Sequence, residues 1–125
     1  MQKGIIADDN KGMRKFLEYY VREKGFEADV VENAGDLIKR VSQGNYDFAI
    51  TDYRMPPGMD GLQATAEIKR LKPGLLVCLA TIGDPETTKM LIAQAEMKPD
   101  FYFDKGGDIK NLGAFLDLVR KSSQQ

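Results

Sequence analysis

The chain has 125 residues, and its 18 Lys and Arg nearly balance its 19 Asp and Glu, which leaves a net charge of −1. This length fits one domain with one core, so we expect a single unit over residues 1–125. The balanced charge argues against direct nucleic-acid binding, and no apolar run is long enough for a membrane span or a signal peptide. A single cysteine, Cys78, fits a reducing, cytoplasmic location. The absence of histidine excludes histidine bases and ligands.

Strand-like runs alternate with helix-like patterns along the whole chain. The runs that predict strands are residues 4–8, 26–31, 46–51, 75–80 and 100–104. Continuously apolar runs such as Leu75–Ala80 are typical of strands that are buried on both faces of a parallel sheet.

Helices are predicted between these strands, and polar residues mark where they begin. Asn10, Asn33 and Asp60 suit the N-caps of the first three helices, and Gly25, Gly44 and the Pro73-Gly74 pair suit their ends. The first helix carries an apolar stripe with helical spacing. Its members are Met13, Phe16, Leu17, Tyr20 and Val21.

Two further helices are predicted near the end of the chain. Asp84 followed by Pro85 is typical of an N-cap and a first-turn proline, and this helix is expected to run to Ala95. Asp108 is expected to open the last helix. The residues predicted to face inward from it are Ile109, Leu112, Phe115, Leu116 and Val119. The polar tail, residues 121–125, is expected to fray.

Five such strand–helix units predict an α/β fold, a doubly wound parallel sheet with five helices. Right-handed crossovers allow few topologies. We favour the flavodoxin-like strand order 2-1-3-4-5, because it places the first and third strands side by side at the switch point where such sheets bind ligands.

Charged and polar residues follow these strands at the points where they end. Asp8 and Asp9 follow the first strand, Asp52 the third, and Lys105 the fifth. In a parallel sheet these ends lie together, so three carboxylates and one ammonium are expected to converge. Neighbouring carboxylates repel each other unless a cation lies between them, and a site with only oxygen ligands and few of them favours Mg²⁺.

This arrangement suits transfer of a phosphoryl group to a carboxylate. Asp9 and Asp52 are expected to bind the metal directly, with Asp8 acting through water or orienting the site, and with the backbone carbonyl of Arg54 as a further ligand. Asp52 is the expected nucleophile, because it ends the central strand. The hydroxyl of Thr81 and the ammonium of Lys105 would offset the charge of the phosphoryl oxygens.

The segments that carry these residues resemble the receiver domain of bacterial two-component response regulators, of the chemotaxis-regulator kind. The matching segments are residues 5–10, 51–56, 59–61 and 79–81, with Tyr102 and Lys105. The resemblance implies that Asp52 is the phospho-acceptor, that Asp8 and Asp9 belong to the Mg²⁺ site, and that Thr81 and Lys105 contact the phosphoryl group. Thr81 and Tyr102 would form the switch, and the fourth helix, fifth strand and fifth helix the output surface.

Four positions depart from the usual pattern of that family. Gly106 follows Lys105 where proline is usual, which predicts either a strained cis bond or a differently routed loop. The turn over residues 55–61 is one residue longer than the common form. Ile82 stands where a small residue is usual. Arg54 is long and cationic, and would either shield the phosphoryl group from water or pair with a neighbouring side chain.

We therefore predict a signalling switch rather than an enzyme. A sensor histidine kinase, a phosphotransfer protein or a small phosphodonor would phosphorylate Asp52, and the changed surface would bind a downstream protein or act on an output domain that this chain lacks. Dimerisation on phosphorylation is left open. One alternative is a pseudo-receiver, an interaction module that is not phosphorylated. Another is a Mg²⁺-dependent phosphohydrolase, although Asp8 and Asp9 are adjacent here rather than one residue apart.

Overall fold

The structure is a computed structural model that describes residues 1–123, and its elements follow the predicted alternation. The strands are β1 (Lys3–Ala7), β2 (Glu27–Val31), β3 (Phe48–Thr51), β4 (Leu76–Thr81) and β5 (Phe101–Asp104). The helices are α1 (Lys11–Glu23), α2 (Ala34–Gln43), α3 (Gly61–Leu71), α4 (Pro85–Gln94) and α5 (Lys110–Ser122).

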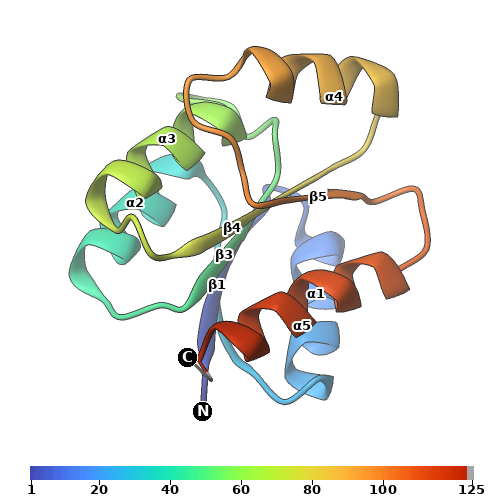
Figure 1. The fold of residues 1–125 in the computed structure, drawn as a ribbon. Helices are drawn as coiled ribbons and strands as arrows, with labels where there is room; N and C mark the ends of the chain where they lie inside the picture. Colours follow the sequence, from blue (N-terminus) through green and yellow to red (C-terminus); the bar gives the residue numbers. More distant parts are fainter. Residues whose placement is uncertain (124–125) are drawn as a thin grey trace.

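The sheet has the predicted strand order, β2-β1-β3-β4-β5, and every pair is parallel. Strands β1 and β3 are neighbours at its centre, with Ala7 opposite Thr51 (Figure 1). The ladder continues one residue further, because the Asp52 amide donates to the Ala7 carbonyl at 2.9 Å. The register therefore brings the residues that follow β1 and β3 to the same edge.

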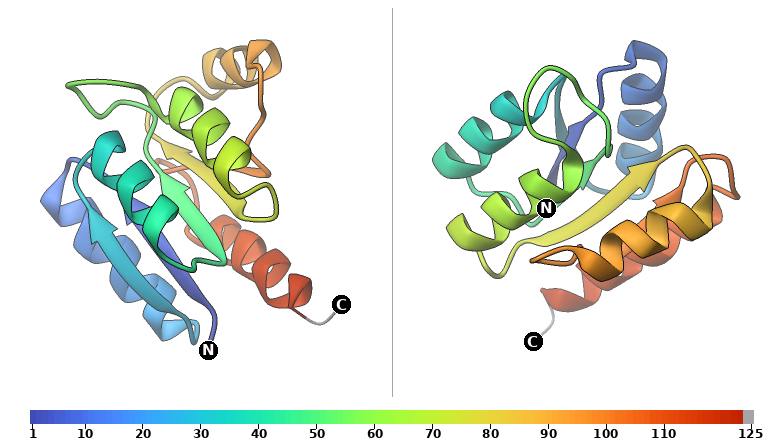
Figure 2. Two further views of the ribbon diagram at one scale, coloured as in Figure 1. Left: turned by 90° about the vertical axis from the view of Figure 1, so that its left-hand side faces the viewer. Right: turned by 90° about the horizontal axis from the view of Figure 1, so that it is seen from above.

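Two hydrophobic clusters cover the two faces of the sheet. Alternate strand residues point to opposite faces, so Ile6 packs with α1 and α5, whereas Ile5 packs with α2 and α3. The helices are arranged accordingly, with α1 and α5 on one side and α2 and α3 on the other (Figures 1 and 2). Both faces are therefore buried, as the continuously apolar strands predict.

Helix α4 differs from the other four, because none of its residues belongs to either hydrophobic cluster. Its only buried residue is Thr88, and Met90 is 63% exposed. Figure 1 places this helix at the top of the view, above β5. Helix α4 is thus attached to the domain by far less apolar burial than α1 or α5.

The predicted caps are present at the first four helices. Asn10, Asn33, Asp60 and Asp84 each accept a hydrogen bond from a backbone amide of the first helical turn. At α5 the start is shifted, since the helix begins at Lys110, and Asp108 accepts from the Lys110 amide at 2.9 Å.

Two local expectations need correction. Phe16 is 47% exposed, because the buried face of α1 is narrower than the predicted stripe and centres on Leu17 and Val21. The expected fraying of residues 121–125 does not begin at Lys121, because α5 continues to Ser122. Gln124 and Gln125 lie outside the described residues. Within the described part of the chain, no helix has the length and hydrophobicity to span a membrane.

Candidate functional site

The structure brings the three strand-end carboxylates together. One carboxylate oxygen from each of Asp8, Asp9 and Asp52 lies within 4.8 Å of the others. Asp8 is 1% exposed, whereas Asp9 lies at the surface. Three hard oxygen donors at this separation match the ligand chemistry of a small divalent cation such as Mg²⁺, with an open side for water.

Lys105 joins this cluster from the end of β5, the edge strand of the sheet. Its ammonium donates to Asp8 Oδ2 and lies 3.3 Å from Asp52 Oδ2, and its side chain is only 6% exposed. The Lys105 amide donates to the Thr81 carbonyl at 3.0 Å, which fixes its backbone at the end of β5. One buried cation therefore partly neutralises the buried carboxylate of Asp8 and the largely buried carboxylate of Asp52.

The Asp52 carboxylate is held in one orientation. Its Oδ1 accepts from the Tyr53 amide at 2.8 Å, and its side chain is 12% exposed. Burial raises the pKa of this carboxyl above its usual value, the nearby Lys105 ammonium lowers it, and the charge of Asp8 raises it again. Asp52 is therefore an ionisable group whose charge the fold opposes, which is a common property of functional sites.

The loop after Lys105 does not contain the strained bond that Gly106 suggested. Over residues 1–123 the only cis peptide joins Pro56 and Pro57, so the Lys105–Gly106 bond is trans. The chain turns instead through Asp104, whose Oδ1 accepts from the Gly106 amide at 2.9 Å and whose carbonyl accepts from the Gly107 amide at 2.9 Å. Lys105 therefore reaches the carboxylates without a cis bond.

Gly61 permits a close approach behind Asp52. A Cβ atom at Gly61 would lie 2.2 Å from the Asp52 carbonyl oxygen and 2.9 Å from Leu79 Cδ1. The Gly61 amide donates to the Tyr53 carbonyl at 2.7 Å. The first residue of α3 thus packs directly against the backbone that follows β3, and only glycine fits there without displacing its neighbours.

Thr81 and Tyr102 lie on the other side of this edge and are held less firmly. The Thr81 hydroxyl has one long contact, 3.4 Å from the Ile82 carbonyl, which is beyond the usual range for hydroxyl donors. The Tyr102 hydroxyl is buried beside Thr88, but no hydrogen bond of ordinary geometry forms. Burial raises the pKa of Tyr102 above its usual value. Both predicted switch residues therefore have polar groups without good partners.

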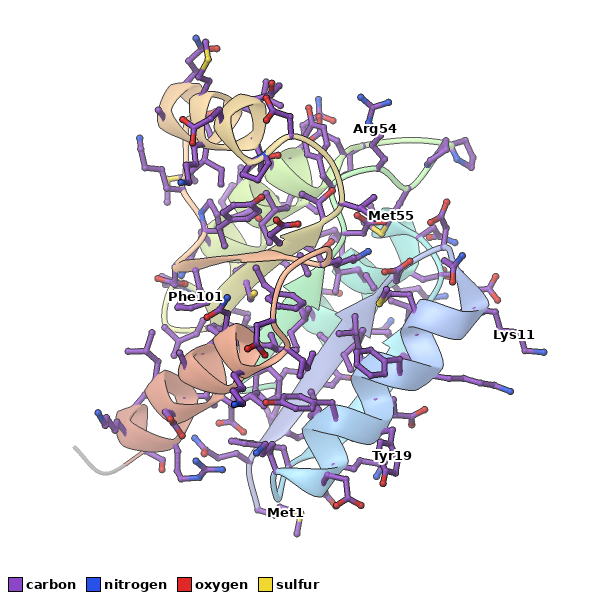
Figure 3. All side chains as sticks on the ribbon, turned by 90° about the vertical axis from the view of Figure 1, so that its right-hand side faces the viewer. Met1, Lys11, Tyr19, Arg54, Met55 and Phe101 are labelled. Carbon is purple, nitrogen blue, oxygen red and sulfur yellow. The ribbon has the colours of Figure 1, made fainter. Side chains whose placement is uncertain are left out.

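Arg54 is exposed, and its side chain extends into solvent away from the sheet (Figure 3). It forms no ion pair with any described residue, so the pairing that the sequence suggested is not seen. Ile82 is 75% exposed. The two positions near Asp52 and Thr81 in the sequence thus carry an exposed cation and an exposed apolar side chain.

The sequence did not single out Arg14, which the structure places against the cluster. Its guanidinium donates to the Asp8 carbonyl at 2.9 Å and to Glu32 at 3.2 Å. A bond to a backbone oxygen leaves no signature in side-chain type, so the only available signal was an arginine one turn after the Asn10 cap.

The profile of the response regulator receiver domain family matches residues 5–116, which is most of the chain. The chain belongs to this family. Phosphorylated aspartate and Mg²⁺ are typical of these receiver domains, which are signalling domains of two-component systems and in general not enzymes.

Curated relatives are longer than this chain. The transcriptional regulatory protein PcoR of Escherichia coli is 29% identical over 126 residues, which cover 100% of this chain and 54% of PcoR. The transcriptional regulatory protein ResD of Bacillus subtilis is 28% identical over 82 residues, 66% of this chain and 34% of ResD. This receiver domain therefore spans about half or less of the length of these relatives.

Solved structures show the same fold. The response regulator TrrA of Thermotoga maritima, in complex with Mg²⁺-BeF, is 28% identical with a TM-score of 0.83, covering 95% of this chain and 99% of TrrA. In the complex of TrrA with the histidine kinase ThkA, the matched chain is 27% identical with a TM-score of 0.79, and the match covers 95% of this chain and 98% of that chain. A receiver domain from Francisella, 21% identical, has a TM-score of 0.85 and covers 98% and 99%.

Proposed function

We propose that this receiver domain is a phosphorylation switch that accepts a phosphoryl group on Asp52. The observation that carries the proposal is the meeting of three carboxylates with the Lys105 ammonium at the carboxyl ends of β1, β3 and β5. The crystal complex of TrrA with Mg²⁺-BeF supports this choice.

In the proposed reaction, an oxygen of the Asp52 carboxylate attacks the phosphorus of the donor. A P–O bond forms, the bond from phosphorus to the donor atom breaks, and its electron pair leaves with the donor, giving an acyl phosphate. The Tyr53 amide keeps the carboxylate aimed during the attack. Lys105 is 3.3 Å from Asp52 Oδ2 and is placed to offset the added negative charge.

Asp8, Asp9 and Asp52 would hold Mg²⁺, with the Arg54 carbonyl as a further ligand. When bound, this ion supplies positive charge to the phosphoryl oxygens. The fit rests on the donor set, which consists of oxygens only and leaves one side open to the surface.

The switch would then work through the less firmly held side of the site. The Thr81 hydroxyl is free to turn toward new phosphoryl oxygens, because its present contact is long. Tyr102 would follow, and α4 would move with it, since Thr88 is its one buried residue. The proposed output surface on α4, β5 and α5 carries exposed apolar side chains, Met90 and Leu118.

A sensor histidine kinase or a phosphotransfer protein is the proposed donor, as the complex of TrrA with ThkA suggests. The proposed recipient of the signal is a downstream protein or a further domain. The single-domain extent over residues 1–125, the cytoplasmic location and dimerisation on phosphorylation stay predictions.

The test is incubation with acetyl phosphate and Mg²⁺, followed by intact-mass measurement. We expect one added phosphoryl group, none in Asp52→Asn and none with EDTA. Asp47→Asn is the matched control, because Asp47 precedes the same strand at its opposite end. An adduct that persists in Asp52→Asn, or no adduct with any donor, would contradict the proposal.

A further inference from the structure

Arg14 connects three segments next to the acidic cluster. Its side chain is 13% exposed although it lies in the first turns of α1. One guanidinium nitrogen, Nη1, donates to the Asp8 carbonyl at 2.9 Å, and Nη2 donates to Glu32 Oε1 at 3.2 Å. Glu32 follows β2, so one side chain ties α1, the loop after β1 and the corner after β2.

The Asp8 carbonyl that Arg14 bonds fixes the position of the Asp9 backbone. A peptide unit is planar, so holding the Asp8 carbonyl also holds the Asp9 nitrogen and Cα. Asp8 is fixed on its other side, because its amide donates to the Val31 carbonyl at 3.2 Å. Asp9 follows this peptide and precedes Asn10, whose side chain caps α1.

Asp9 itself has no comparable restraint. Among the hydrogen bonds and ion pairs formed by residues 1–123, none involves the Asp9 carboxylate, and the residue is exposed. Its carboxylate nevertheless lies within 4.8 Å of those of Asp8 and Asp52. Its position therefore depends on the backbone on either side of it.

We propose that Arg14 is a positioning residue of the cation site, which aims the Asp9 carboxylate by clamping the Asp8–Asp9 peptide. This inference rests on the proposed function, because it takes Mg²⁺ as the ion bound by Asp8, Asp9 and Asp52. Arg14 touches neither the ion nor the phosphoryl group. It acts through the planar peptide, with Glu32 as the anchor that keeps its guanidinium in place.

Helix α1 offers a matched control two turns further on. Arg22 also donates from Nη2 to a backbone carbonyl, that of Ala28, at 2.7 Å, and it also pairs with a glutamate, Glu18, at 3.2 Å. Arg→Lys at either position keeps the charge but removes the planar fork that bonds two acceptors at once. Arg22 is more exposed than Arg14, 52% against 13%, so the comparison concerns Mg²⁺ affinity: a purely structural role predicts that neither substitution changes it.

The experiment is a calorimetric titration of the full chain with Mg²⁺. We expect Arg14→Lys to weaken Mg²⁺ binding about tenfold, the range seen when a residue behind a metal ligand is changed. Arg22→Lys should bind Mg²⁺ as the wild type does, although it also weakens a bond to a backbone carbonyl and an ion pair. Equal Mg²⁺ affinity in Arg14→Lys and Arg22→Lys would overturn the inference.

A metal-free measurement separates this inference from the proposed function. The ¹⁵N order parameter of the Asp9 amide should fall in Arg14→Lys and not in Arg22→Lys. Glu32→Gln, which weakens the anchor but leaves Arg14 in place, should give a smaller fall and keeps the test open if Arg14→Lys does not fold. An unchanged order parameter in these variants rejects the clamp. Absence of Mg²⁺ binding by the wild type rejects the proposed function instead.

Discussion

The two sides of the candidate site are held very differently. On the side of β1 and β3, Asp8 and Asp52 accept hydrogen bonds from backbone amides, and Lys105 pairs with both. Around α4, the Thr81 hydroxyl at the end of β4 has one long contact, and the Tyr102 hydroxyl of β5 has none of ordinary geometry. The difference teaches that this fold holds the acidic cluster and Lys105 rigidly, next to a helix, α4, that is anchored by little buried surface.

Removing the cation from the fixed side should have the largest effect. Lys105→Met leaves Asp8 and Asp52 without their shared partner, and we expect the free energy of unfolding without Mg²⁺ to fall by about 3 kcal/mol. Denaturant titration measures it. Added Mg²⁺ should recover part of the loss. The control is Lys69→Met, which removes a largely buried cation from another ion pair, with the more exposed Asp100, and which Mg²⁺ should not rescue. Rescue of both variants would contradict this account.

Filling the fixed side with a cation is the next largest effect. At a Mg²⁺ concentration of about 100 times its dissociation constant, the wild type should gain about 2.7 kcal/mol by mass action. Asp9→Asn should unfold within about 0.5 kcal/mol of the wild type in EDTA, because Asp9 is exposed, but should lose most of the gain. Thermal unfolding with and without Mg²⁺ measures this gain. A full gain in Asp9→Asn would show that Asp9 is not a ligand of the ion.

Two tyrosines differ in whether the hydroxyl forms a hydrogen bond. Tyr46 donates to Asp29 at 2.6 Å, so Tyr46→Phe should cost about 1.5 kcal/mol. The buried Tyr102 hydroxyl has no such bond, so Tyr102→Phe should leave the free energy of unfolding unchanged or slightly higher. A loss at Tyr102 as large as that at Tyr46 would show that the side with Thr81, Tyr102 and α4 is not loosely held.

The smallest expected effect concerns the charge of Asp52. Burial raises its pKa in the folded protein above that in the unfolded chain, so stability is lost as the pH rises and the carboxyl ionises. Asp52→Asn should therefore melt above the wild type at pH 7 without Mg²⁺. The gap should close as the pH falls below about 3.9, where the carboxyl is protonated in both states. A gap that widens toward low pH would show that the pKa is lowered instead.

Much of the fixed side could be predicted from the sequence, because its signals are local. Asp8 and Asp52 directly follow apolar runs, and parallel register then places them at one edge. The N-caps at Asn10 and Asp60 are equally local signals. Lys105 could be assigned to this edge only through the strand order.

The rest depends on tertiary packing that no short pattern encodes. Phe16 matches the helical stripe but lies at the margin of the buried face of α1. The trans bond after Lys105 follows from the turn at Asp104, and Arg14 matters through a backbone carbonyl. The weak attachment of α4 through Thr88 appears only when the core is assembled.

The most direct measurement of the central claim is a two-dimensional NMR titration of the full chain with fluoroberyllate and Mg²⁺. Beyond the residues that contact the added groups, we expect the amide shifts to change most in α4 and at Tyr102, and little in α1 and α2. Asp52→Asn should show none of these changes. Shifts spread evenly over the five helices, or an α4 that does not respond, would contradict a fixed site that drives a loosely held helix.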